Sequence, residues 1–560
     1  MPEQSQLASQ IRVKIDGTEL QPDVMANVAS VEVDQHAYLP AMFTVRLQTP
    51  ELDLIDDTPF DLTKEVEISA QGEDETWVDL VKGEVTALEP EYQEGMIARL
   101  VVRGYDKSHR LYRESKSVAH LNKKDSDLAS EIAQGAGLQA DVEATSTVYD
   151  HILQHNQTDL AFLKQRAWRI GYECYVSDGK LVFRKPVAGS TTATLGWGDT
   201  LLTFFPRMSL SEQVDEVVVR GWSAKDKTAI VGRADRGALY AKTGESKNGA
   251  SWASSFGSGK HIIVDQTVAS QAEADALAAA RLTEISGAFV QADGEAIRQP
   301  AIRAGKAVEL EGLGRRFSGT YLVTSAHHVY SPEGLKTQFS VKGTRSGLLL
   351  EQMRDPGADS RSPGVVVAQV TNVEDPENLG RVKVKYGWMT DDAESFWARV
   401  VGIGAGNGAG YWIIPQVGDE VLVAFEHGDM QRPYILGGLW NAEDAPPPTA
   451  KGGGRDPEVR SWHSASGHHI TVHDNEDNKI EIVTQGGQKI ILDDANKNIT
   501  IASSSGMVVT FDDGGSKFSV EGSEIEIKAS GSLKIEAGAN MDLQAGGQVT
   551  IKGAMINLNP

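Results

Sequence analysis

Strict alternation of apolar and polar residues dominates the pattern in residues 1–120. The phrase IRVKIDG places Ile11, Val13 and Ile15 on one face of a strand and then turns at Asp16 and Gly17. The phrases FTVRLQTP, EVEISAQG and ARLVVRGYD alternate in the same way. Short alternating strands separated by polar turns are typical of a β-barrel or a β-sandwich.

The period changes to that of a helix in residues 125–185. In DSDLASEIAQGAG the apolar positions recur at four-residue spacing, and the helix is expected to end at Gly135 or Gly137. In TDLAFLKQRAWRIG, Thr158 is the expected N-cap and Gly171 the expected end. These helices interrupt a region that is otherwise made of strands.

A third helix is predicted within a second β-rich region. The phrase SQAEADALAAARLTEISG begins with a capping box, Ser270 with Glu273, and ends at Gly287. We therefore expect residues 1–350 to form two similar β-barrel subdomains with small helical insertions.

Residues 351–364 read as a linker because they are rich in Pro, Gly, Ser and Asp. The following segment, 365–442, contains about five strand blocks, a number that suits a small closed barrel of the OB type. A second linker, 443–460, carries the phrase EDAPPPTAKGGG. It is too short to hold a further domain.

The last domain, 461–560, repeats a short strand with two apolar residues at i and i+2. The step is nine or ten residues at first and settles to eight from Ile525, with seven at the end. A fixed period of this kind indicates a solenoid or an array. Gly522, Gly531, Gly538, Gly546 and Gly553 fall between the later pairs. The pairs are Ile480/Ile482, Ile490/Leu492, Ile499/Ile501, Val509/Phe511, Phe518/Val520, Ile525/Ile527, Leu533/Ile535, Met541/Leu543, Val549/Ile551 and Ile556/Leu558.

One such strand cannot bury a core, because half of its apolar edge stays wet and its backbone groups stay unpaired. Three chains wound into an intertwined triple-stranded β-helix would solve both problems, with strands from all three chains stacked on each face. A single-chain β-helix with three faces per coil is the alternative. In the trimer, the core residues are expected to be Ile480, Ile482, Ile490, Leu492, Ile499, Ile501, Ile525, Ile527, Leu533, Ile535, Met541, Leu543, Val549 and Ile551.

The charge and cysteine content limit the kinds of partner and of covalent stabilisation that are expected. The 54 Lys and Arg against 78 Asp and Glu give a net charge of −24, which disfavours nucleic acid as the main partner. The single cysteine, Cys174, excludes an intramolecular disulfide and is expected to be buried. We see no signal-peptide pattern and no run of about 18 apolar residues, so we expect no membrane segment and cytoplasmic assembly.

Two sets of phrases resemble the family of VgrG-type spikes and phage baseplate hub and spike proteins. NVEDPENLGRVKVKYGWMTDDAESFWARVV and GNGAGYWIIPQVGDEVLVAFEHGDMQRPYILGGLWN resemble its baseplate protein V OB domain. HSASGHHITVHDNEDNKIEIVTQGGQKIILDD resembles the entry into its triple-stranded β-helix. ARLVVRGYDKSHRL, QTDLAFLKQRAWRIGYE and DGKLVFRKP resemble, more weakly, its hub.

The resemblance implies a homotrimeric spike and hub in the baseplate of a contractile injection system: a phage tail, a type VI system or an extracellular particle. Its hub would form a pseudo-six-fold ring that contacts the inner tube or a tube-initiator protein, with baseplate wedge proteins around it. Its needle would meet the target envelope. A PAAR-type tip protein is expected at the C-terminal end, on Met555, Ile556, Leu558 and Pro560.

No residue is expected to be catalytic, and no cofactor or metal is expected. Some family members carry a lysozyme domain where this chain has only residues 443–460, so wall cleavage is not expected. A cell-wall or polysaccharide hydrolase that uses a β-helix groove is the alternative, and an OB-type nucleic-acid binder is another. The histidines at 463, 468, 469 and 473 leave metal ligation as an alternative, although their spacing fits no HExxH or CxxC-type site. Trp388, Trp397, Trp412 and Trp440 are expected in the barrel core or a subunit interface.

Overall fold

The computed structural model describes residues 10–95, 97–186, 191–345, 364–387, 389, 394–447 and 458–558. The predicted linker 351–364 except Gly364, most of the linker 443–460, Trp388 and Pro560 lie outside these residues. The chain divides into two compact units, Met1–Leu439 and Trp440–Pro560, and each is described by itself. Among the described residues, no helix has the length and apolar character needed to cross a membrane.

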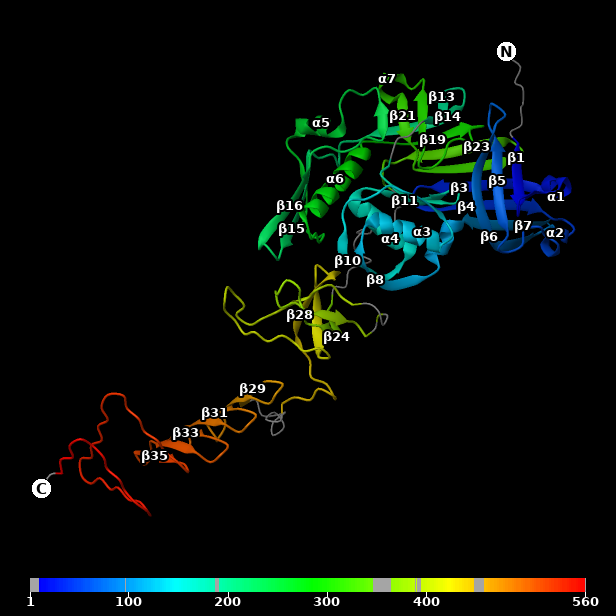
Figure 1. Cartoon of the computed structure of the whole chain (residues 1–560). Helices are drawn as coiled ribbons and strands as arrows, with labels where there is room; N and C mark the ends of the chain where they lie inside the picture. Colours follow the sequence, from blue (N-terminus) through cyan, green and yellow to red (C-terminus); the bar gives the residue numbers. More distant parts are fainter. Residues whose placement is uncertain are drawn as a thin grey trace, which may run out of the picture. The chain divides into compact units, whose positions relative to one another are not determined.

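The first unit is built around one continuous antiparallel sheet of eleven strands (Figure 1). The pairing of β3 with β22 joins the strands of the N-terminal segment to those that follow residue 200. In sheet order the strands are β14 (Leu201–Met208), β19 (Val290–Ile297), β23 (Gly334–Val341), β22 (Ser325–Ser331), β3 (Val28–His36), β4 (Leu39–Gln48), β7 (Ile97–Asp106), β6 (Trp77–Gln93), β5 (Glu65–Gln71), β1 (Ile11–Ile15) and β2 (Thr18–Glu19).

Alternation decides which face of this sheet is buried. Phe43, Val45 and Leu47 on β4 belong to the hydrophobic core of the N-terminal half, as the sequence predicted. A second core gathers around Phe339 on β23 and Tyr321 on a smaller sheet. The predicted hairpin turn at Asp16 and Gly17 is confirmed, because both residues have positive φ.

Two helices and two small sheets follow the eleven-stranded sheet's first half. The predicted caps are confirmed: the Thr158 hydroxyl accepts a hydrogen bond from the Ala161 N–H at 3.3 Å, and Gly171 ends its helix in the left-handed region. Cys174 is buried, also as predicted. The elements are η1 (Lys107–Tyr112), β8 (Ser115–Lys123), α3 (Asp125–Gly135), β9 (Gln139–Val142), β10 (Tyr149–Thr158), α4 (Asp159–Ile170), β11 (Glu173–Ser177) and β12 (Lys180–Arg184).

The second half adds a four-stranded sheet, a three-stranded sheet and the long helix α6. The predicted N-terminus of α6 is confirmed, because the Ser270 hydroxyl accepts from the Glu273 N–H at 3.2 Å. The sheets are β13 (Thr191–Gly196), β20 (Ala307–Glu311), β21 (Gly319–Leu322) and β17 (Ala241–Thr243), then β16 (Thr228–Ala234), β15 (Glu216–Ser223) and β18 (Lys260–Ile263). The helices are α1 (Pro22–Ala26), α2 (Asp53–Asp56), α5 (Gly249–Ala253), η2 (Ser254–Phe256), α6 (Gln271–Gly287) and α7 (Gly314–Phe317).

A five-stranded sheet closes the first unit. Its core includes Leu153 of β10, so a ribbon from the preceding part of the chain completes it. The predicted strand block 410–429 contains one strand, at Glu420–Glu426, while its first residues, 410–416, form no strand and expose Tyr411 and Trp412. In sheet order the strands are β25 (Lys383–Lys385), β24 (Val366–Asn372), β27 (Glu420–Glu426), β28 (Asp429–Gly438) and β26 (Arg399–Val400).

The second unit contains a seven-stranded antiparallel meander in which each strand pairs with the next along the chain. Each of the seven strands is five residues long. They are β29 (Val459–His463), β30 (His469–His473), β31 (Lys479–Val483), β32 (Lys489–Asp493), β33 (Asn498–Ala502), β34 (Val508–Asp512) and β35 (Lys517–Glu521).

Candidate assembly site

The strand register of the meander aligns its apolar residues into two rows on one face. Each predicted pair stands directly opposite the next, as Ile480 does to Leu492 and Ile482 to Ile490. The first row is Trp462, Ile470, Ile482, Ile490, Ile501, Val509 and Val520. The second row is Arg460, Val472, Ile480, Leu492, Ile499, Phe511 and Phe518. We call this surface the apolar face.

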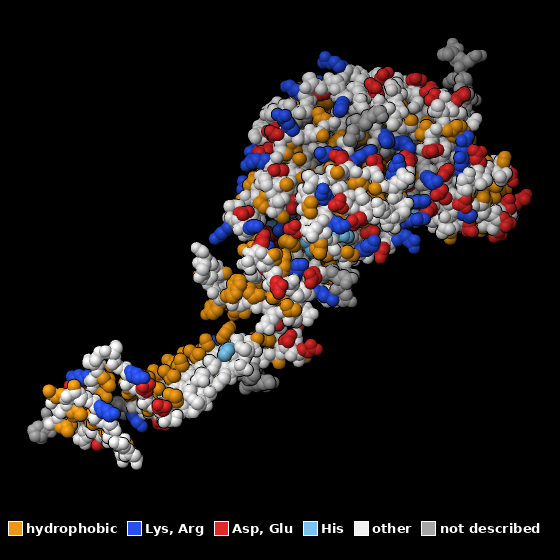
Figure 2. All heavy atoms as spheres, viewed as in Figure 1, with side chains coloured by type: hydrophobic (Ala, Val, Ile, Leu, Met, Phe, Trp, Pro, Cys, Tyr) orange, Lys and Arg blue, Asp and Glu red, His pale blue; other side chains and the backbone are white. Residues whose placement is uncertain are grey.

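The apolar face is open to solvent. Its side chains keep 39% exposure at Ile490, 47% at Phe511 and 61% at Phe518. Figure 2 shows hydrophobic side chains following one another along these strands. Monomeric soluble proteins rarely expose so long an apolar strip, and such strips mark surfaces that another molecule covers.

The opposite face of the same strands is mostly polar, with Ile491 as an apolar exception in its central row. Thr471, Thr500 and Thr510 lie along its centre. At one side, the Lys479 ammonium lies 3.2 Å from the Glu481 carboxylate, which raises the pKa of Lys479. Burying the apolar face of such a sheet is favourable, whereas burying its polar face is not. The alternation of the sequence therefore determines which face a partner would cover.

The repeat length of this region follows from its turns. A five-residue strand plus a connection of five residues, such as 484–488, or of four, such as 494–497, gives the irregular steps of ten and nine. The glycines Gly467, Gly487 and Gly506 provide the positive φ that three of the turns require.

These turns correct one expectation. The sequence pattern predicted that neighbouring strands would come from three different chains throughout the repeat. From β29 to β35 the neighbours come from the same chain instead, because each connection is long enough to reverse the chain into a hairpin. The predicted core residues Ile480, Ile482, Ile490, Leu492, Ile499 and Ile501 nevertheless all lie on the apolar face.

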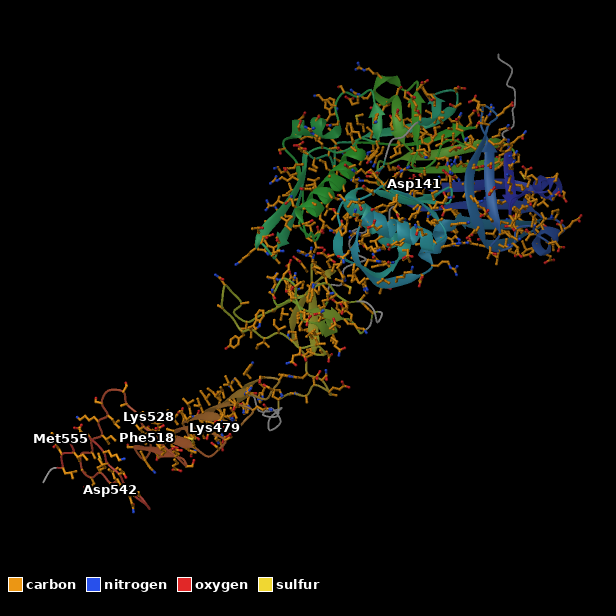
Figure 3. The ribbon with its side chains drawn as sticks, viewed as in Figure 1. Asp141, Lys479, Phe518, Lys528, Asp542 and Met555 are labelled. Carbon is orange, nitrogen blue, oxygen red and sulfur yellow. The ribbon has the colours of Figure 1, made fainter. Side chains whose placement is uncertain are left out.

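After Gly522 the chain has no assigned strand up to Leu558. The described residues of this segment pair with no strand of their own chain. The apolar pairs are exposed, with Ile527 at 68% and Leu543 at 72%. Figure 3 shows the side chains of this segment, with Lys528, Asp542 and Met555 labelled. The remaining predicted core residues, all exposed here, are Ile525, Leu533, Ile535, Met541, Val549 and Ile551.

The described tip residues are all exposed, two of them strongly. Met555 and Leu558 keep 79% and 84% of their surface, and Ile556 about half of its own. Pro560 lies outside the described residues.

Sequence reasoning missed the beginning of the apolar face. Trp462, Ile470 and Val472 belong to the two rows but were absent from the predicted core. The apolar pair Ile470 and Val472 in HHITVHD has the same i, i+2 spacing as the predicted pairs and could have identified this strand. The histidines of this phrase were considered as metal ligands instead.

His463, His469 and His473 lie on the polar face of the same strands, whereas His468 lies in the connection between β29 and β30. The rings of His463 and His469 stack at 4.8 Å, and burial followed by the nearby His469 charge lowers the pKa of His463. Nε2 of His473 lies 3.6 Å from a Glu481 carboxylate oxygen. Within the part of the chain that the structure describes, no three His, Cys, Asp or Glu side chains converge as metal ligands would.

The predicted core tryptophans differ in exposure. Trp397 is partly buried, with the Lys383 ammonium 5.4 Å from its ring centre. Trp412 and Trp440 are exposed, so their expected place in the barrel core is wrong, while an interface role stays a prediction. The Gly402–Trp412 segment forms turns, as expected for a loop.

Two family models match the chain. Residues 5–331 match the model described as the Alg8 N-terminal domain, and residues 366–440 match the type VI secretion system/phage-baseplate injector OB domain. The second match covers the five strands β24 to β28 almost completely.

Curated relatives carry the name of spike proteins. The type VI secretion system spike protein VgrG1a of Pseudomonas aeruginosa is 31% identical over 203 residues, which is 30% of this chain and 32% of the relative. VgrG1b of the same organism is 40% identical over 75 residues, 13% of this chain and 10% of the relative. The chain thus spans about a third or less of the length of these relatives.

Among solved structures, the fold resembles the Francisella PdpA–VgrG complex. In its lidless form the likeness has a TM-score of 0.51 at 9% identity and covers 92% of this chain and 98% of the other. The lidded form gives a TM-score of 0.52 at 9% identity, with 88% and 80% covered. At such low identity the likeness concerns the fold alone.

Proposed function

The chain belongs to the Alg8 N-terminal domain family and is related to VgrG-type spike proteins, and from this premise we propose that it is the structural hub and spike of a contractile injection machine. Three copies assemble through their apolar faces and C-terminal segments. The role is mechanical, and no side chain acts as a catalyst.

The apolar face carries this proposal. Covering a half-exposed Ile or Leu is worth about 1 kcal/mol, and each chain presents two rows of such residues. A five-residue strand is only about 17 Å long, so one meander makes a narrow face. Three narrow faces can close a triangular prism whose apolar rows all meet at the axis.

The segment 523–558 supports a second mode of association. Its pairs recur every eight residues without hairpins, so strand partners must come from other chains. We propose that three copies of this segment interleave, and that a chain wound in this way cannot be pulled out of the needle singly. Force from a contracting sheath would then pass to the end of the needle.

The remaining partners follow from the family. We propose that the hub contacts the inner tube or a tube-initiator protein, that baseplate wedge proteins surround it, and that a PAAR-type tip protein covers Met555, Ile556 and Leu558. Met555 and Leu558 are the most exposed of the large apolar residues described in 523–558, which favours a cap at that end.

The assembly is tested by light scattering on the full-length protein. We expect three times the chain mass of 60.4 kDa. The double variant Ile490→Asp with Ile499→Asp places charges on the apolar face and should abolish the trimer. Lys489→Asp with Lys517→Asp places charges on the other face of the same meander, on β32 and β35, and should leave the trimer intact. A well-folded single subunit for the unaltered protein would overturn the proposal, and a dimeric mass would exclude the three-faced prism.

The tip is tested separately with the candidate tip protein. Trimers that carry Ile556→Asp with Leu558→Asp should keep their mass and lose tip binding. Unaltered binding of the tip protein would contradict the proposed tip site. It would not bear on the proposal that the chain forms a trimer.

A further inference from the structure

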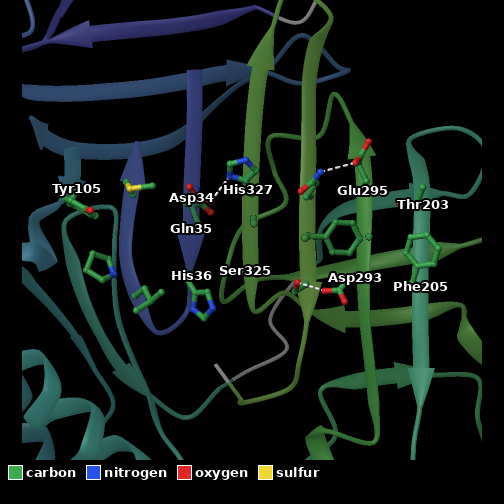
Figure 4. A pocket seen from close by; sticks show the side chains of 18 residues that line it. Asp34, Gln35, His36, Tyr105, Thr203, Phe205, Asp293, Glu295, Ser325 and His327 are labelled. Atoms are coloured by element: carbon green, nitrogen blue, oxygen red, sulfur yellow. Dashed lines mark hydrogen bonds and ion pairs between the residues drawn. The ribbon is translucent and has the colours of Figure 1, made fainter. Parts of the chain in front are cut away.

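The polar face of the eleven-stranded sheet contains a cavity of about 700 Å³ (Figure 4). It lies across the seam where β3 pairs with β22, and its lining comes from both halves of the sheet. We call it the seam groove. Nothing in the proposed spike function uses it.

Strand register explains why its lining residues meet. Two rungs of directly opposed residues cross the sheet from β14 to β4 and on to β7. The first rung is Phe205, Asp293, Ser340, Ser325, His36 and Leu39. The second is Thr203, Glu295, Gln338, His327, Asp34, Met42 and Tyr105.

Three carboxylates occupy the middle of these rungs. Asp34 binds His327 across the seam, Glu295 accepts from Gln338 at 3.2 Å, and Asp293 accepts from Ser340 at 2.6 Å and from Lys342 at 2.9 Å. The bonds to Asp34 and Glu295 each engage one carboxylate oxygen, whereas Asp293 accepts on both of its oxygens. Asp34 and Asp293 keep 44% and 58% of their side-chain surface exposed. A carboxylate has about four acceptor positions, so capacity for a further cation remains.

Apolar side chains stand at both ends of the same rungs. Phe205 on β14 is 70% exposed, which is unusual for a large aromatic residue on a sheet. At the other end, Leu39, Met42 and Tyr105 line the groove. Taken together, the two rungs place apolar residues at both ends and carboxylates on β19 and β3, with neutral residues and His327 between the carboxylates.

The geometry sets the shape of an occupant. Neighbouring strands are about 4.8 Å apart, so the acidic positions on β19 and β3, three strands apart, are separated by about 14 Å. An extended chain covers this distance in about four residues at about 3.3 Å each. A helix about 10 Å wide that spanned the apolar ends, about 24 Å apart, would need nearly 1,900 Å³, far more than the groove offers.

We propose that the seam groove binds an extended segment of a partner protein with two Lys or Arg residues about four positions apart, flanked by apolar residues. The carboxylates of Asp34 and Glu295 receive the two cations, and Phe205 covers one apolar end. The charge of the lining favours such a segment over one of this acidic chain itself.

The test uses the full-length protein and fluorescently labelled heptapeptides in an anisotropy titration. The probe is Leu-Lys-Gly-Ser-Gly-Lys-Leu, and the control peptide carries Glu in place of both Lys. We expect binding of the probe alone, weakened at high salt, because the contact is between charges near solvent.

Variants locate the binding. Asp34→Asn with Glu295→Gln should weaken the probe at least tenfold, and Phe205→Ala a few-fold. Glu51→Gln with Asp235→Asn removes two exposed carboxylates elsewhere and should change nothing. Equal binding of both peptides, no loss in the groove variants, or cross-links from a second copy into the groove of the free protein would each overturn the proposal. The spike proposal is tested by the mass of the assembly and the groove proposal by peptide binding. Failure of one can therefore be told from failure of the other.

Discussion

The strands of the hub and those of the meander follow the same alternation, yet they end in opposite environments. On β4, Phe43 and Val45 are fully buried, because the sheet curls around a core that its own chain completes. On β32, Ile490 and Leu492 remain exposed, because the meander is a single layer within its own unit. The alternation of apolar and polar residues therefore predicts which face of a strand is apolar. Whether the same chain covers that face depends on the rest of the fold.

The largest expected effect comes from one truncation made in both regions. Phe43→Ala removes a fully buried ring and should lower the free energy of hub unfolding by about 3–5 kcal/mol. Phe511→Ala should leave the hub transition unchanged and weaken the trimer instead. Calorimetry with mass measurement checks both. Equal loss of hub stability in the two variants would contradict the distinction between a closed and an open region.

The second largest effect is expected in the pH dependence of hub stability, because the hub contains a buried histidine. Burial, then the charges of Arg303 and His327, lower the pKa of His328 to about 3. The unfolded chain binds this proton below about pH 6.5 and the folded hub does so only near 3, so the hub loses stability as pH falls through that window. The slope is about 1.4 kcal/mol per pH unit.

The control for this titration is His328→Gln, which cannot titrate and can still bond to Thr337, the residue that lies 2.9 Å from Nδ1 of His328. The difference between the two hub unfolding curves, followed by denaturant at each pH, isolates the imidazole. Parallel curves from pH 7 to 4 would refute the assignment.

A smaller effect is expected in the OB-like sheet. Asp375 accepts two hydrogen bonds from the Arg381 guanidinium, at 2.6 and 3.0 Å, and others from backbone N–H groups, so its pKa lies well below its usual range. Its stabilisation is complete above about pH 4 and fades below it. Asp375→Asn should cost about 1.5–3 kcal/mol at pH 7, and less at pH 3, because the stabilisation fades progressively as pH falls from the unfolded-state pKa towards the lowered folded-state pKa. Denaturant unfolding of the full-length protein at both pH values checks this.

The smallest effect should come from charges in the C-terminal segment. Lys528 and Glu526 form a fully solvated pair, and exposed pairs contribute about 0–1 kcal/mol. Lys528→Ala should therefore leave the trimer intact, whereas the adjacent change Ile527→Asp should disrupt it. If both variants dissociate equally, residues 523–558 do not alternate between inside and outside.

Local signals predicted local structure well. The caps Thr158 and Ser270, the turn at Asp16 and the alternating strands depend on residues close in sequence, and all are found. The strand of the predicted block 410–429 begins only at Glu420, because the apolar residues at the start of the block, Tyr411 to Ile413, are exposed on a loop. The hairpins from β29 to β35 were missed because an apolar pair every nine or ten residues fits either a hairpin or an interleaved strand.

The sequence by itself determined the two apolar rows of the C-terminal strands, since a period of two assigns each side chain to a face regardless of the neighbours. Only the tertiary structure decided which chain supplies the neighbouring strand, and that His328 is buried while His327 faces the seam groove. The same holds for the groove itself. Asp34, Glu295 and His327 lie on strands far apart in the chain, and only long-range strand pairing brings them together.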